Sequence, residues 1–120
     1  MNSRQISESK TVTTSLDLVA TIPVQDRETL GLDIAVTTAA LDQFAILGQF
    51  HPGGTFQTLF STSADFTSPT GLLVGASGDL TAQAVGSGFF IMDCDGLSAV
   101  QIKAASGTTT SGVALKGSAK

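Results

Sequence analysis

The sequence contains no tryptophan and no tyrosine, and its seven aromatic residues are all phenylalanine. Sugar-binding surfaces and antibody-like binding sites favour rings that can both stack and form hydrogen bonds. Phenylalanine supplies only the apolar half of that interaction. We therefore expect the rings in the core or in a dry protein interface, and not in a ligand-binding platform.

Charged residues are also scarce, at 13% of the 120 residues, and the net charge is −4 with only 6 Lys and Arg. Nucleic acid and anionic lipid are bound by clustered cations, so neither is an expected partner. The mean hydropathy of +0.29 excludes intrinsic disorder, which needs low hydrophobicity and high net charge. The longest uncharged stretch, 43–64, alternates and holds several polar residues, which does not suit a membrane-spanning helix.

The single cysteine, Cys94, excludes an intramolecular disulfide and any zinc site built from paired cysteines. The first residues are polar and are not followed by an apolar run of signal-peptide length. The sequence thus predicts a protein made in a cytoplasm and not exported by the usual route.

What the sequence does contain is hydrophobic residues that alternate with polar ones. This period of two is typical of half-buried strands, because successive side chains leave opposite faces of the strand. It predicts a strand over 12–22 and another over 30–36. It also predicts a hairpin with arms 44–50 and 56–60, joined at His51-Pro52-Gly53-Gly54. Shorter apolar segments follow at 72–74, 89–92, 100–104 and 113–115, with a helical turn over 80–85 between them.

Seven or eight short strands separated by turns predict an all-β, single-domain antiparallel β-sandwich. The strand order is not determined at this point, so jelly-roll and immunoglobulin-like topologies both remain open. Residues 1–11 are polar and patternless, and we expect them to form an arm outside a sandwich of residues 12–120.

Residues that could carry chemistry have simpler structural explanations. His51 lies in a tight turn, where a catalytic triad with a serine and an acid is seldom assembled. Asp93 and Asp95 with Gly96 resemble part of a calcium loop but lack the distant glutamate, and they suit a turn. Cys94, between two acids and next to an apolar run, is expected to be a buried small hydrophobe. The remaining acids and the glycine-rich stretches form no glycosidase pair and no phosphate loop, so we expect no enzyme activity, metal or cofactor.

Three stretches resemble small all-β virion proteins of tailed bacteriophages, a group that includes many capsid-decoration proteins. They are LDQFAILGQFHPGGTF, SADFTSPTGLLVGASGDL and GFFIMDCDGLSAVQI, and together they span Leu41 to Ile102. The resemblance implies a β-sandwich that sits on an assembled shell, commonly as a trimer at symmetry axes. It also implies that the protein binds no cofactor and catalyses no reaction.

On this basis we expect a virion structural protein that decorates and stabilises the capsid, with the major capsid protein or other virion proteins as partners. We expect it to be a homo-oligomer, with a trimer favoured. The arm and the apolar strand 89–92 are the predicted contact regions; the predicted interface residues are Asn2, Arg4, Ile6, Lys10, Phe89, Phe90 and Met92.

Two other functions remain open. A tail, baseplate or head-fibre adaptor would use the same sandwich at another place on the particle. A carbohydrate-binding or hydrolytic β-sandwich would need a concave face with acids and rings, for which this composition offers little.

Overall fold

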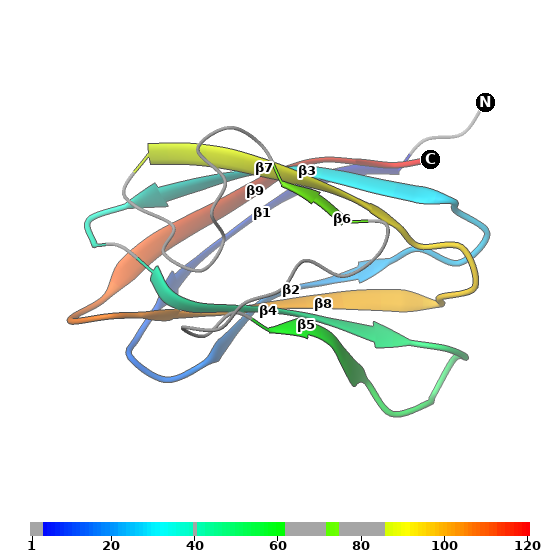
Figure 1. Ribbon diagram of the computed structural model, residues 1–120, viewed down its shortest axis with the longest axis horizontal. Coiled ribbons are helices and arrows are strands. Elements are labelled where there is room, and N and C mark those ends of the chain that lie inside the picture. Colours follow the sequence, from blue (N-terminus) through cyan, green and yellow to red (C-terminus); the bar gives the residue numbers. More distant parts are fainter. Residues whose placement is uncertain (1–3, 40, 62–71, 75–85) are drawn as a thin grey trace.

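The computed structural model describes residues 4–39, 41–61, 72–74 and 86–120, and these form strands and turns without a helix (Figure 1). A helix able to span a membrane is accordingly not found among them. The strands are β1 (Arg4–Val12), β2 (Asp17–Pro23), β3 (Thr29–Thr37), β4 (Leu41–Gln49), β5 (Gln57–Ser61), β6 (Leu72–Val74), β7 (Gly86–Asp93), β8 (Ala99–Ser106) and β9 (Ser111–Ala119).

The strands form two antiparallel sheets that face each other as two layers (Figure 1), which confirms the predicted β-sandwich. One sheet has the order β1-β9-β3-β7-β6 and the other has the order β2-β8-β4-β5. The first strand pairs with the last, β2 with β8, β3 with β7, and β4 with β5. A long antiparallel ribbon folded over on itself makes this pattern. The topology is therefore a jelly roll, one of the two left open above, with β6 added at an edge.

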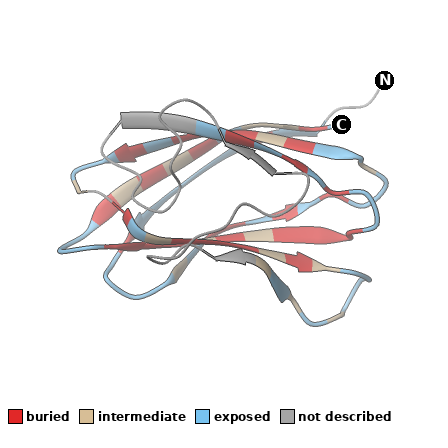
Figure 2. Cartoon of the chain, viewed as in Figure 1, coloured by how far each residue is buried: buried red, intermediate tan, exposed pale blue. Residues whose placement is uncertain are grey.

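The core lies between the two sheets (Figure 2), and alternate residues of β3 and β9 contribute to it, whereas β4 and β8 also bury consecutive residues. In β3, for example, Leu30, Leu32, Ile34 and Val36 are all buried, and the residues between them face outward. Phe44 of β4 and Phe90 of β7 join the layers at the centre. Their ring centroids are 6.2 Å apart and the rings are tilted by 71°, an edge-to-face contact across the sandwich.

Hydrogen bonds in the turns show why the strands end where they do. After β1, the carboxylate of Asp17 accepts bonds from the Thr13 backbone N–H at 2.7 Å and from the Thr13 hydroxyl at 2.8 Å. These bonds hold the pKa of Asp17 below its usual value, and the positive charge of Lys10 adds to the effect. In the β4–β5 hairpin, Gly53 has a φ of 81° and the Gly54 N–H donates to the His51 carbonyl.

The prediction of an arm over residues 1–11 is wrong from Arg4 onward. Residues Arg4–Val12 form β1, which pairs with β9 residue by residue from Arg4–Ala119 to Val12–Ser111. Only Ile6 and Val12 of this strand are buried. The hydrophobic alternation is weak because β1 lies at a sheet edge, and its order comes from the backbone ladder. Asn2 lies outside the described residues.

Other boundaries also differ from the prediction. The single strand predicted over 12–22 is divided by the turn at 13–16, where the chain passes from one sheet to the other. The last strand continues beyond Leu115 to Ala119, because β9 is bonded on both sides, to β1 and to β3. The described residues contain the eight jelly-roll strands and the three-residue β6, against seven or eight predicted. The helical turn predicted over 80–85 lies outside the described residues.

Candidate interaction surface

Across β1, β9 and β3, the outward face of the five-stranded sheet carries mainly small side chains. Four rows cross β1, β9 and β3 in register, and the bonded partners are Thr11–Gly112–Thr37, Ser9–Ala114–Ala35, Ser7–Lys116–Asp33 and Gln5–Ser118–Gly31. In these rows Asp33 and Lys116 are the only charged residues, and they lie opposite each other. A face of this kind can approach another flat surface closely, because few long side chains must be moved or desolvated.

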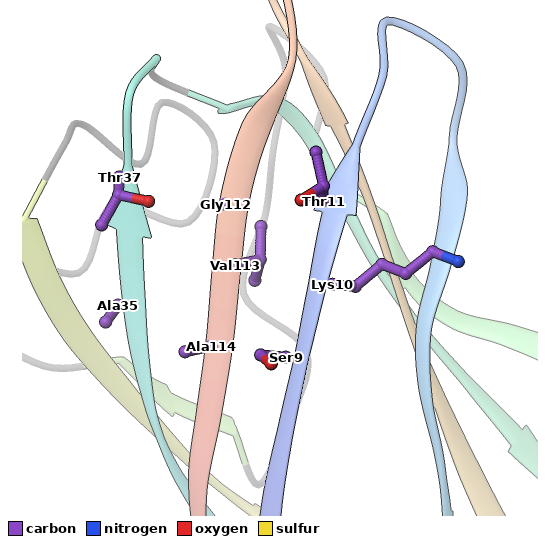
Figure 3. Close-up of a pocket in the computed structure, with 8 residues that line it drawn as sticks. All are labelled: Ser9, Lys10, Thr11, Ala35, Thr37, Gly112, Val113 and Ala114. Carbon is purple, nitrogen blue, oxygen red and sulfur yellow. The ribbon is translucent and has the colours of Figure 1, made fainter.

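This face has open hollows where its side chains are small. One of about 320 Å³ lies where Ser9, Ala35, Ala114 and Gly112 leave space between the three strands (Figure 3). A second, of about 220 Å³, lies over Gly31 and is bordered by Phe89, Ile91 and Lys116. Neither hollow is lined by two carboxylates. Their shape and lining suit contact with another protein better than enclosure of a small molecule.

The apolar part of this surface is provided by β7. Phe89 and Ile91 are 40% and 39% exposed, and they lie opposite Asp33 and Gly31 of β3. Large hydrophobic residues that are exposed side by side on one face often mark a surface that another molecule covers. Isolated exposed hydrophobic residues do so less often. We call Phe89 and Ile91, together with the four rows, the outer face.

The structure separates the predicted interface residues into two groups. Arg4, Lys10 and Phe89 are exposed. Phe90 and Met92 are instead buried in the core, at 0% and 8% exposure, so the prediction that they contact a partner on the surface of the sheet is wrong. Ile6, at 7% exposure, also packs into the core, although its strand β1 lies at an edge of the sheet. Successive residues of a strand face opposite sides, so the residue exposed beside Phe89 is Ile91 and not Phe90 or Met92. The period of two could have grouped Ile91 with Phe89, although not shown which pair of the run faces outward.

The residues weighed above as chemical candidates lie in or beside turns. His51 is exposed, and its Nδ1 lies 3.2 Å from the carbonyl oxygen of the adjacent Pro52. The Asp93 carboxylate accepts a bond from the Asp95 N–H at 3.1 Å, and Gly96 follows with a φ of 89°. This is a local turn between β7 and β8. In the described part of the chain, no three His, Cys, Asp or Glu side chains come together in a way that could hold a metal ion.

Cys94 is fully buried, as predicted, in the same turn. Burial raises the pKa of its thiol to about 11, and the charges of Asp93 and Asp95 add to the effect. Because the folded-state pKa lies above the ordinary 9.0, the thiol's contribution to stability is complete below about pH 9 and is lost as the pH rises through 11.

Native Cys94 is therefore expected to react with a disulfide reagent such as DTNB about a hundredfold more slowly at pH 8 than the urea-unfolded chain, because the thiolate fraction falls with the raised pKa. Stopped-flow absorbance on native and unfolded protein measures the two rates. Equal rates would contradict the burial of the thiol.

Comparison with known proteins yields a structural likeness only. No protein-family model matches the sequence, and no curated protein matches it either. A solved structure, the crystal structure of SPBc2 prophage-derived protein YomS, superposes with a TM-score of 0.59. The match covers 100% of this chain and 96% of that one at 15% sequence identity. The likeness at this identity shows a shared fold, a compact all-β sandwich.

Proposed function

We propose that this protein is a non-enzymatic structural component of a bacteriophage particle, which docks on the outside of the capsid and stabilises it. Two independent observations support a phage origin. Residues 41–102 resemble small virion proteins of tailed phages, and the fold is shared over the whole chain with a prophage-derived protein.

The observation that carries the docking role is the outer face. It joins the exposed Phe89 and Ile91 to a broad area of glycine, alanine, serine and threonine that holds one acid and one base. Such a face loses little side-chain entropy on contact and desolvates few charges, while two apolar side chains supply the anchor. It fits a surface that is itself flat and repeated.

The mechanism is mechanical. Each copy makes a modest contact, and many copies bound to one shell hold neighbouring capsid subunits together. The capsid subunits are already linked in the lattice, so a copy bound to one subunit meets the neighbouring subunit at a high effective concentration. The bound copies therefore resist separation of the subunits.

A binding experiment with shells of the encoding phage, assembled without this protein, tests the proposal. Purified protein should sediment with the shells in a saturable way, and Phe89→Ser should weaken binding about tenfold or more, as loss of an apolar anchor does. Leu18→Ser is the matched control, because Leu18 is exposed to a similar extent, 42%, but lies in the other sheet.

Absence of saturable sedimentation, or equal binding by the two variants, would contradict this role for the outer face. Cryo-electron microscopy of complete particles then locates the protein. Density on the tail and none on the head would replace the capsid proposal with the tail or baseplate adaptor.

A further inference from the structure

The two sheets have four edge strands, and three of these are protected against pairing with other chains. β6 has three residues. β5 has five, and its register with β4 shifts between Ile46 and Leu47. β2 has a register shift between Leu18 and Ala20 and ends at Pro23. Short strands, bulges and prolines are the usual means by which proteins prevent edge-to-edge association.

β1 has none of these three features. Its nine residues pair one for one with β9 without a register shift, and the strand contains no proline. Among the strands that the structure describes, none pairs with its other side. This edge therefore offers a long, uninterrupted row of backbone donors and acceptors to another strand.

The side chains of β1 indicate what kind of strand would pair with this edge. Ile6, Glu8, Lys10 and Val12 share the side of the strand that faces the other sheet, and Glu8 and Lys10 are exposed there. Inward-pointing charges also discourage unwanted pairing, because a random partner would leave them unmatched. Their signs are complementary, however, when the strand meets a second copy of itself.

Consider two β1 strands that pair antiparallel about a two-fold axis at Ser9. Every residue from 6 to 12 then lies opposite a residue of compatible charge or polarity. Glu8 then lies opposite Lys10 of the second copy, and this pair occurs twice. Ile6 lies opposite Val12, and Ser7 opposite Thr11. Directly opposed charges of opposite sign and opposed apolar residues stabilise antiparallel pairs, whereas like charges destabilise them.

Other two-fold registers are less favourable. An axis at Ser7 opposes Arg4 to Lys10, and an axis at Glu8 or at Lys10 opposes a charge to itself. An axis at Ile6 opposes Arg4 to Glu8 but spans only the five residues 4–8 of the described strand. Lys10 also lies near Asp17 of its own chain. Its ammonium group has three N–H donors, so it can donate both to Asp17 and to Glu8 of the second copy.

We propose that β1 is a homodimerisation strand, through which two copies pair antiparallel about Ser9 and join their five-stranded sheets into one. This two-fold association differs from the trimer that the family resemblance implies. A two-fold axis perpendicular to the joined sheet keeps both outer faces on the same side. The dimer would thus present twice the docking area to a shell. This consequence rests on the proposed function, but the proposal that β1 forms a dimer does not.

Sedimentation equilibrium of the purified chain over a concentration series is the first test. The expected mass is twice the 12.2 kDa of the chain, and Glu8→Lys should raise the dissociation constant about tenfold or more because two attractive pairs become repulsive. Glu28→Lys makes the same change in net charge at an exposed turn position away from β1 and should leave dimerisation unchanged. A monomer or a trimer at all concentrations, or equal effects of the two variants, would overturn the proposal.

Charge exchange tests the register directly. Lys10→Glu should weaken self-association as Glu8→Lys does, and a mixture of the two single variants should form a heterodimer. The double variant Glu8→Lys/Lys10→Glu should recover homodimerisation. A structural defect caused by either substitution would not be repaired by mixing, so absence of the heterodimer from folded variants counts against the register.

Cysteine cross-linking locates the axis. Ser9→Cys should form a disulfide-linked dimer on mild oxidation, because residues directly opposed in an antiparallel pair have Cα atoms about 4.5–5.5 Å apart, within disulfide range. Buried Cys94 does not compete. Ser7→Cys is the matched control on the same face and should not cross-link; the reverse result would move the axis to Ser7 and overturn the proposed pairing. Shell binding by monomeric Glu8→Lys would leave the proposed function standing without the dimer.

Discussion

Phe44→Ala is expected to lower the free energy of unfolding by about 3–5 kcal/mol, the largest loss we anticipate for a single substitution in this protein. Phe44 is 0% exposed and packs edge to face against Phe90 of the opposite sheet. Truncation removes buried apolar area and leaves a cavity between two sheets that are each held by their own hydrogen bonds. The layers cannot collapse freely into that space, so the cavity cost is retained.

Urea denaturation followed by circular dichroism measures this loss, which corresponds to a decrease in Tm of about 10–20 °C for a domain of this size. Phe50→Ala is the matched control. It removes the same ring six residues further along, where the side chain is 59% exposed, and should change stability by about 0.5 kcal/mol or less.

A similar loss in both phenylalanine variants would contradict the proposed packing. If Phe44→Ala does not fold, Phe44→Leu retains most of the volume and should still be clearly less stable than the wild type. A double-mutant cycle with Phe90→Leu then isolates the ring contact, for which about 0.5–1.5 kcal/mol is expected.

Gly117→Ala is expected to cost about 3 kcal/mol, at the upper end of the usual range for overpacking. Gly117 lies in β9 between Ile6 of β1 and Leu32 of β3. A Cβ atom at this position would overlap the backbone carbonyl of Gly31. Backbone in a paired strand cannot rotate away as a side chain could, so the central strands would have to separate.

Gly31→Ala tests whether the effect is steric. At Gly31 the nearest atom to an added Cβ is Cγ1 of Ile91 at 3.9 Å, an ordinary van der Waals contact. Alanine also restricts the unfolded chain, so this control should be neutral or slightly stabilising. Thermal unfolding of the two variants gives the comparison; equal loss in both would show that the contact with the Gly31 carbonyl is not the reason for the glycine at position 117.

Alternation was sufficient to predict the strands that bury a full side. The 30–36 segment and the 44–60 hairpin are both present, and in 30–36 the apolar residues recur at every second position and face the core. In the hairpin the period holds only in part, because Phe50 is 59% exposed and Leu59, not Thr58, packs against the core. β1 was missed for the opposite reason. It buries only Ile6 and Val12, so its strand conformation depends on hydrogen bonds to β9, at the other end of the chain.

The surface residues could be predicted only in part. The apolar run 89–92 indicated a strand with hydrophobic residues on both sides, and the structure has Phe90 and Met92 in the core and Phe89 and Ile91 outside. Which parity faced the core could not be known from the run itself, since both parities are apolar. Pairing with β3 decided it, by placing Phe90 opposite the buried Leu32.

The sequence by itself determined that the chain folds into strands, that two apolar faces must close on each other, and that Cys94 would be buried. These properties depend on the local spacing of apolar residues and on the composition of the chain, and both can be read directly from the sequence. Tertiary structure alone decided the jelly-roll order, the strand character of β1 and the makeup of the outer face. Each of these depends on which distant strands share backbone hydrogen bonds, and strand pairing leaves no mark in the residues of one strand considered alone.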